Sequence, residues 1–341
     1  MRTEALWFCG PRSARVLPAE APPPGSGEVR VEAEFSAISA GTELLVYRGE
    51  VPKNLPLDLP TLEGSFAFPV KYGYALTGRV RDVGGAVAGL AAGDAVFVHH
   101  PHQRALTVPA ASVVRLPEGV GPLEGVFFAN LETALNVVHD TPVKLGETVA
   151  VTGLGVVGLL VAALLARSGA RVVASDGRKA RRELARRLGA GAVCTPERLS
   201  DLVSRETEGR GVDAVVEASG SGTALDAALG CVIREGTVVV ASWYGTKPVS
   251  LDLGSNFHRG RVRLRSSQVG SIAPELTPRW SRERRTRTVL DLLPTLGLGR
   301  LVSHRVPLGR APEVYGKLDG DEPFGREAVQ VVIDYHQSRE R

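Results

Sequence analysis

Cysteine is scarce in this chain of 341 residues, which contains only Cys9, Cys194 and Cys231. The three are widely spaced, odd in number and form no CxxC pair, which argues against a disulfide framework and against a cysteine zinc knuckle. The N-terminal residues also lack the cationic start and long apolar core of a signal peptide. We therefore expect a protein of the reducing cytoplasm.

Aromatic residues and surplus charge are limited as well. Aromatics make up 5% of the chain against 43% hydrophobic residues, glycine occurs 39 times, and the formal net charge is +4. Many aliphatic residues with abundant glycine favour stacked α/β layers over a disordered chain. So small a charge on so long a chain gives no indication of nucleic-acid binding. The length predicts about two domains.

One uncharged stretch, residues 149–166, approaches the length of a membrane span. Three glycines at its centre, Gly153, Gly155 and Gly158, indicate a different structure. They predict a buried strand, a tight turn and a buried helix. We expect no membrane span.

The pattern of the chain changes near Pro122 and again near Gly270. Before Pro122, short β-rich segments such as EVRVEAEF and AVFVHH are separated by turns rich in glycine and proline, typical of an irregular antiparallel or barrel-like unit. Further on, strands and helices alternate, which predicts a parallel sheet with right-handed crossovers. After Gly270 a block similar to the first third closes the chain. We expect an α/β protein with one domain from residues 1–122 and 271–341 and another from residues 123–270.

The motif GLGVVG lies between an apolar strand and an apolar helix. Gly153 permits a tight turn, Gly155 lets the backbone approach a pyrophosphate, and Gly158 lets helix and strand pack closely. The helix that begins with Val156 and Val157 offers free amides and a positive dipole end to phosphates. The motif therefore predicts a dinucleotide-binding site.

The next strand ends at Asp176, eighteen residues after Gly158. A carboxylate there accepts hydrogen bonds from a ribose 2′-hydroxyl and repels a 2′-phosphate, which favours NAD. Arg178 and Lys179 follow at once and weaken that preference. NAD is the expected cofactor, and NADP stays possible.

Several motifs together resemble the medium-chain dehydrogenase/reductase superfamily. The resemblance lies in GETVAVTGLGVVGLL, EASGSG, GDAVFV and VPAASVVRLPEGV and runs almost from end to end. It implies a GroES-like β-rich catalytic domain built from both ends of the chain, a Rossmann domain, and a cleft between them. SAISAGTE and SWYGTKPVSLDLG are most similar to the branch that contains bacteriochlorophyllide dehydrogenase-like proteins. Because superfamily members commonly pair their last Rossmann strand, here near RVRLRSSQVG, a homodimer is expected.

Alcohol dehydrogenases of that superfamily hold a catalytic zinc at three positions that carry other residues here. Their ligands are a Cys in a CGTD-like motif, a His in a GHE motif, and a third Cys or Glu on the helix before the Rossmann domain. This chain has AGTE, GYALTG and FFANLETA, which place Ala40, Tyr74 and Ala129 at those positions. The four-cysteine structural zinc loop is absent too. Alanine cannot coordinate zinc and one tyrosine would not retain it, so the resemblance predicts no metal site.

Without a metal, side chains must exchange the proton that accompanies hydride transfer. Thr42 matches the family's hydroxyl relay position, although it is equally suited to capping a turn. Tyr74 can donate to a carbonyl oxygen, or it fills the space of the former metal site. In FVHHPHQ, His100 corresponds to a residue of the substrate-pocket wall in the zinc-dependent members of the superfamily. We expect it either to contact substrate or transfer a proton, or to be an ordinary polar residue of the wall. His99 is expected to be structural or exposed, and His102 to lie in a turn.

Four further residues are expected near the cofactor. Thr133 matches a position that packs on the nicotinamide ring in relatives, or it bonds its own helix backbone. Ser219, Ser242 and Tyr244 follow parallel strands at the edge where such sheets bind ligands. Tyr244 is alternatively a lid of the substrate pocket.

Two arginine-rich segments have structural explanations. RVRLR, residues 261–265, is expected to be an edge strand whose charges block unwanted pairing, with an acidic substrate or partner as the alternative. RWSRERRTR, residues 279–287, is expected to be the solvated face of a helix, because no stacking aromatics are interleaved for nucleic acid.

These features predict an NAD(P)-dependent dehydrogenase or reductase that moves hydride between nicotinamide and an alcohol or carbonyl carbon of a small molecule, without zinc. A quinone or enoyl reductase, also zinc-free in this superfamily, is the second interpretation. A non-catalytic NAD(H)-binding regulatory subunit is the third. No nucleic-acid or membrane partner is expected.

Overall fold

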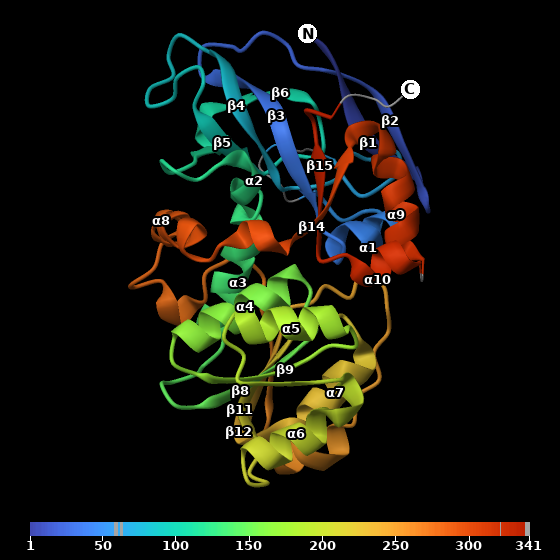
Figure 1. Cartoon of the computed structure of the whole chain (residues 1–341), viewed down its shortest axis with the longest axis vertical. Helices are drawn as coiled ribbons and strands as arrows, with labels where there is room; N and C mark the ends of the chain where they lie inside the picture. Colours follow the sequence, from blue (N-terminus) through green and yellow to red (C-terminus); the bar gives the residue numbers. More distant parts are fainter. Residues whose placement is uncertain (58–60, 62–63, 321, 338–341) are drawn as a thin grey trace. The chain divides into compact units, whose positions relative to one another are not determined.

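The computed structural model describes residues 1–57, 61, 64–320 and 322–337. The chain divides into two compact units, the first built from Met1–Ala129 and Leu290–Arg341 and the second from Asn130–Val289. The colours of Figure 1 show that the first unit takes both ends of the chain. The predicted domain limits, after residues 122 and 270, differ from this division and stay a prediction. Within the first predicted domain, residues 58–60, 62, 63, 321 and 338–341 lie outside the described residues.

The first unit is rich in antiparallel strands. Its strands are β1 (Arg2–Gly10), β2 (Ser13–Glu20), β3 (Glu28–Ile38), β4 (Leu76–Val83), β5 (Ala95–Val98), β6 (Ala105–Pro109), β7 (Val113–Arg115), β14 (Val302–Pro307) and β15 (Gln330–Asp334). The larger sheet has the order β14-β15-β3-β4-β5-β7, and β6 also pairs with β3. β3 pairs antiparallel with β4, β6 and β15, so one long strand joins both ends of the chain. The strand predicted from EVRVEAEF is confirmed, and the strand predicted from AVFVHH is confirmed only as far as Val98.

Short helices close the core of the first unit. They are α1 (Thr42–Arg48), α2 (Pro122–Gly125), α9 (Ala311–Asp319) and α10 (Pro323–Glu327). The rings of Phe8 on β1 and Tyr315 on α9 meet edge to face, with centroids 5.0 Å apart. Both side chains are almost completely buried, so packing holds α9 against β1.

The second unit contains one parallel sheet. Its strands are β8 (Thr148–Thr152), β9 (Arg171–Ser175), β10 (Ala192–Cys194), β11 (Val212–Glu217), β12 (Val232–Val240) and β13 (Arg263–Ser266). They pair in the order β10-β9-β8-β11-β12-β13, and every pairing is parallel. This is the strand order of a doubly wound Rossmann sheet. The predicted α/β fold, with a β-rich part and a Rossmann part, is confirmed.

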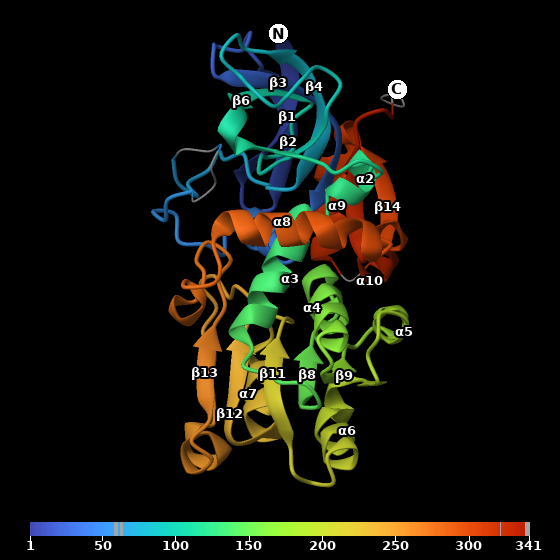
Figure 2. The same cartoon turned by 90° about the vertical axis from the view of Figure 1, so that its left-hand side faces the viewer.

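Helices cover both faces of this sheet (Figures 1 and 2). Those of the second unit are α4 (Val156–Arg167), α5 (Lys179–Arg187), α6 (Leu199–Glu206) and α7 (Gly222–Cys231), while α3 (Phe128–Asp140) and α8 (Arg282–Leu292) each reach its boundary. The uncharged stretch 149–166 forms β8, the glycine turn and most of α4, as predicted. No helix in the described part of the chain is long and apolar enough to cross a membrane.

The arginine-rich segments differ in burial. β13 lies at the edge of the sheet, as predicted, and Arg265 on it pairs with Asp140 at 3.0 Å. The prediction of a solvated face for residues 279–287 is wrong at Arg285, which is only 4% exposed. Its guanidinium lies 3.1 Å from the Glu132 carboxylate and donates to Asn136 Oδ1 at 2.8 Å. These partners compensate the buried charge, so Arg285 joins α8 to α3.

Candidate functional site

The turn between β8 and α4 has the geometry that its glycines predict. Gly153 has φ +84°, and a Cβ there would lie 2.5 Å from Cα of Ser219. A Cβ on Gly158 would lie 1.9 Å from the carbonyl oxygen of Gly153, whereas a Cβ on Gly155 would meet nothing within 4 Å. Close packing therefore requires glycine at 153 and 158. At 155 the absent side chain leaves backbone open to a ligand.

The N-terminus of α4 is available for an anion. Gly155 precedes the helix, no side chain caps it, and Val156 and Val157 are partly exposed. Uncapped amides at the positive end of a helix dipole suit a pyrophosphate. The turn fits a dinucleotide.

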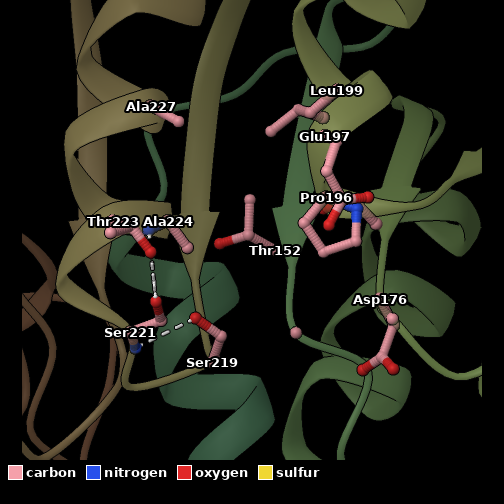
Figure 3. A pocket seen from close by; sticks show the side chains of 13 residues that line it. Thr152, Asp176, Pro196, Glu197, Leu199, Ser219, Ser221, Thr223, Ala224 and Ala227 are labelled. Carbon is pink, nitrogen blue, oxygen red and sulfur yellow. Dashed lines mark hydrogen bonds between the residues drawn. The ribbon is translucent and has the colours of Figure 1, made fainter.

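A pocket of about 340 Å³ lies in the second unit, where β8, β9 and β11 end (Figure 3). Its lining residues are Thr152, Gly153, Ser175, Asp176, Gly177, Pro196, Glu197, Leu199, Ser219, Ser221, Thr223, Ala224 and Ala227. Thr152 is only 2% exposed, and its Oγ1 is buried without a hydrogen-bond partner in the described part of the chain. Because an unpaired buried hydroxyl is costly, this atom indicates a place where a bound molecule donates or accepts a hydrogen bond. The pocket has the size of a nucleotide site.

Asp176 lines the pocket and is 9% exposed. Its Oδ2 accepts from the amide of Leu154 at 2.8 Å, and its Oδ1 accepts from the amide of Arg178 at 2.7 Å. The carboxylate thus joins the glycine turn to the start of α5. The guanidinium of Arg181 lies 3.9 Å from Oδ2, so a positive charge is close to the acid.

The three predicted residues after β11 and β12 gather around a carboxylate that the sequence analysis missed. Glu217 is fully buried, and its Oε1 accepts from the amide and hydroxyl of Ser219, both at 2.6 Å. Tyr244 donates to Oε2 at 2.9 Å, and the hydroxyl of Ser242 accepts from Gly220 N at 2.9 Å. Burial and the charge of Glu217 raise the pKa of Tyr244. An acid at the end of an apolar strand, in VVEASG, was the pattern that could have identified Glu217.

Thr133 lies on α3 and is partly exposed. It is not among the residues that line the pocket. Its predicted contact with nicotinamide stays a prediction.

In the first unit, Tyr74 lies close to the start of α1. Its hydroxyl donates to Oγ of Ser39. Burial, followed by the charge of Glu43, raises the pKa of Tyr74 to about 12, while hydrogen bonds with Ser39 and Thr42 oppose the rise. The structure thus brings the predicted residues Thr42 and Tyr74 together. The phenol keeps its proton at neutral pH and can donate it.

The histidines of FVHHPHQ lie in different surroundings. His99 is partly buried, with its ring centroid 4.8 Å from that of Phe97. His100 is 5% exposed, and burial lowers its pKa to about 3, with a smaller opposing effect of the carbonyl of Pro101, 2.9 Å from Nδ1. His102 lies at a bend, as predicted, but its side chain is completely buried. The substrate contact predicted for His100 stays a prediction.

Known proteins match both the sequence and the fold. Residues 156–285 match the family described as zinc-binding dehydrogenase. The chain is 28% identical over 313 residues to D-guloside 3-dehydrogenase of Escherichia coli (strain K12), covering 85% of this chain and 88% of the relative. It is 26% identical over 356 residues to 2-dehydro-3-deoxy-L-galactonate 5-dehydrogenase of Pseudoalteromonas atlantica, covering 95% and 97%. A protein of Sinorhizobium meliloti 1021, solved bound to NADP, has the same fold with TM-score 0.78 and 23% identity, covering 98% and 99%.

In sequence and fold the chain is therefore similar to zinc-binding dehydrogenases of the medium-chain alcohol dehydrogenase type. The predicted branch of bacteriochlorophyllide dehydrogenase-like proteins stays a prediction.

The zinc ion implied by this superfamily does not fit the residues present. Ala40 and Ala129 have no donor atom, and Tyr74 supplies one neutral phenol. The nearby imidazole of His102 and carboxylate of Glu43 are fully buried and bonded to each other at 3.0 Å. Within the described ranges, no group of three or more His, Cys, Asp or Glu could hold a metal.

Proposed function

We propose that this chain is an NAD(P)-dependent oxidoreductase that moves hydride between its cofactor and an alcohol or carbonyl carbon without catalytic zinc. The glycine turn carries the proposal, because it combines two glycines required by packing with an open backbone at Gly155 and an uncapped helix. The relatives named above are dehydrogenases, which supports an oxidoreductase.

The chain's own residues hold the cofactor in this proposal. Amides of Gly155, Val156 and Val157 bind the pyrophosphate, and Asp176 binds the adenosine ribose. The remaining predicted contacts come from Thr133, Gly153, Gly158, Arg178, Ser219, Ser242 and Tyr244. When bound, the nicotinamide ring supplies the hydride acceptor or donor. The negative charge of Asp176 favours NAD, and the neighbouring arginines leave NADP as the alternative.

Tyr74 is the proposed proton donor to the carbonyl oxygen, since it is the protonated hydroxyl at a position where zinc-dependent alcohol dehydrogenases of the superfamily have a zinc ligand. Thr42 assists it as a neighbouring hydroxyl, and His100 contributes to the substrate wall. To donate its proton, the phenol exchanges its hydrogen bond to Ser39 for one to the carbonyl oxygen, and it then supplies a proton where a metal would supply charge. The names of the relatives suggest secondary alcohols of small polyhydroxylated compounds as the substrate class.

Calorimetric titration of the purified chain with NAD⁺, NADH, NADP⁺ and NADPH tests the cofactor. We expect saturable binding of at least one pair, with NAD(H) bound more tightly. Failure of all four to bind would contradict the proposal.

A panel of secondary alcohols, ketones, enones and quinones tests the reaction. We expect turnover of alcohols or ketones, and a loss of about 100-fold in kcat for Tyr74→Phe. Tyr72→Phe is the matched control, because that ring lies 6.2 Å from Tyr74 and has no assigned role. Turnover restricted to enones or quinones would favour a conjugated-alkene reductase, and tight binding without any turnover would favour a regulatory subunit.

A further inference from the structure

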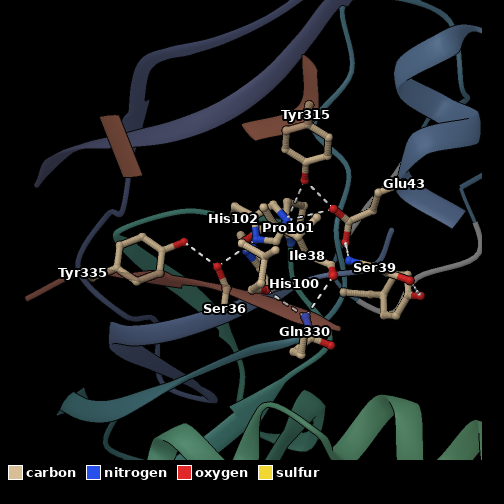
Figure 4. Close-up of polar contacts among 12 residues, drawn as sticks. Ser36, Ile38, Ser39, Glu43, His100, Pro101, His102, Tyr315, Gln330 and Tyr335 are labelled. Atoms are coloured by element: carbon tan, nitrogen blue, oxygen red, sulfur yellow. Dashed lines mark hydrogen bonds and ion pairs between the residues drawn. The ribbon is translucent and has the colours of Figure 1, made fainter. Parts of the chain in front are cut away.

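Five polar side chains meet inside the first unit (Figure 4). They are Ser36 of β3, Glu43 of α1, His102, Tyr315 of α9 and Tyr335. Four of them are completely buried, and Tyr335 is 6% exposed. A buried carboxylate and imidazole cost free energy that an apolar set of the same volume avoids. The cluster therefore indicates a role beyond filling the core.

Every polar side-chain atom of Glu43 and His102 has a partner. Oε2 of Glu43 lies 3.0 Å from Nε2 of His102 and accepts from the hydroxyl of Tyr315. Nδ1 of His102 lies 2.7 Å from the hydroxyl of Ser36, which lies 2.9 Å from the hydroxyl of Tyr335. A carboxylate oxygen accepts, so Nε2 of His102 donates to Glu43. The contacts at both ring nitrogens fix the orientation of the ring.

Glu43 also holds the residue that receives the hydrogen bond of Tyr74. Its second oxygen, Oε1, accepts from the amide of Ser39 at 3.0 Å, and its own amide donates to the carbonyl of Ser39 at 2.9 Å. The hydroxyl of Ser39 is the acceptor for Tyr74. One carboxylate thus binds His102 on one side and fixes the partner of Tyr74 on the other.

His102 additionally contacts the backbone that carries Tyr74. Gly73 has φ +139°, and a Cβ there would lie 2.9 Å from Nε2 of His102. The ring therefore packs directly against the residue before Tyr74, where no side chain could fit. The imidazole thus contacts Gly73 directly and is connected to Ser39 through Glu43.

We propose that Glu43 and His102 are positioning residues that hold the Tyr74 hydroxyl in place. The pair acts through Ser39 and through Gly73, and it touches neither substrate nor cofactor. The inference rests on the proposed function in one respect, namely that Tyr74 donates a proton to the substrate.

Fluorine NMR of the full chain labelled with 3-fluorotyrosine tests the proposal without a substrate. Tyr74→Phe identifies the Tyr74 signal. We expect Glu43→Gln and His102→Leu to displace or split that signal. His102→Gln keeps a donor near the position of Nε2 and should leave the signal closer to that of the parent chain.

Glu217→Gln is the matched control, because Glu217 is equally buried and also accepts from a tyrosine, Tyr244, but has no bond to Ser39. It should leave the Tyr74 signal in place. An unchanged Tyr74 signal in folded Glu43→Gln and His102→Leu chains would overturn the proposal. If His102→Leu fails to fold, Glu43→Gln, which keeps the size of the side chain, decides alone.

Turnover separates this inference from the proposed function. The Tyr74 signal could be displaced in the Glu43 and His102 variants while Tyr74→Phe retains full turnover. That result would support the positioning pair and show that Tyr74 is not needed for the reaction. With a substrate from the panel, His102→Leu should lower kcat about tenfold with a smaller change in KM, the pattern of a lost transition-state interaction.

Discussion

At the scale of single residues, Thr152 gives the sharpest indication of a bound molecule. Its hydroxyl is buried in the pocket without a partner in the described residues, and Thr→Val keeps the shape while removing that group. We expect Thr152→Val to raise the free energy of unfolding of the ligand-free chain by about 1 kcal/mol. The same change should weaken dinucleotide binding by roughly fivefold, because about 1 kcal/mol of hydrogen bonding is lost.

Thermal unfolding and calorimetric titration measure the two effects on one sample. We expect Thr152→Val to be more stable than the parent chain and to bind the dinucleotide more weakly. A variant that loses stability and binds as tightly as the parent would show that Thr152 is structural.

His100 should make the chain sensitive to acid. Burial lowers its pKa from 6.5 to about 3, so the folded state resists protonation while the unfolded state accepts it. The contribution of His100 to stability is present above pH 6.5 and is lost as the pH falls towards 3, by up to about 1.4 kcal/mol per pH unit. His100→Gln should remove this part of the pH dependence in urea titrations between those limits. An identical pH dependence in the variant and the parent would contradict the assignment.

Some residues could be predicted from the sequence, and others could not. The tight turn at the glycines of GLGVVG and the position of Asp176 after the next strand could be predicted, because their spacing is local and each has one physical reason. The contact of Glu43 with His102 and Tyr315 joins positions far apart in the chain, and no local pattern specifies it. Arg285 was misread because composition alone does not show which arginine of a helix faces a buried acid.

At the scale of elements, the turn between β8 and α4 provides a matched pair of substitutions. Gly158→Ala places a Cβ 1.9 Å from the carbonyl oxygen of Gly153, whereas Gly155→Ala meets no protein atom within 4 Å. We expect Gly158→Ala to cost at least about 1–3 kcal/mol of stability. Gly155→Ala should cost less than about 1 kcal/mol but abolish tight dinucleotide binding, because the methyl group blocks the pyrophosphate.

Denaturant unfolding and titration with NAD(H) distinguish the two variants. If a folded Gly155→Ala chain binds NAD(H) as tightly as the parent chain, the turn is not part of the cofactor site.

The elements of the second unit followed from the sequence more fully than those of the first. Alternating strand and helix patterns with short connections predict one topology, because right-handed crossovers exclude most others. The first unit depends on β3 pairing with strands from both ends of the chain, which is not encoded in any single segment.

At the scale of the whole molecule, the edge strand β13 bears on assembly. Leu264 is 41% exposed on it, and the Arg263 side chain is 67% exposed. The backbone of an edge strand can pair with the same strand of a second copy; the exposed Leu264 favours this pairing, and the arginines beside it oppose it. We expect light scattering to report twice the chain mass of 36.1 kDa. The mass of a single chain at working concentration would contradict the expectation of a homodimer.

The central claim is hydride transfer by an NAD(P)-dependent enzyme that needs no zinc. The most direct test measures metal content and nicotinamide absorbance change on the same chelator-treated sample, with a substrate from the panel. The account predicts turnover without stoichiometric zinc and no gain when zinc is added. One tightly held zinc per chain, with turnover lost on its removal and restored on its return, would contradict it.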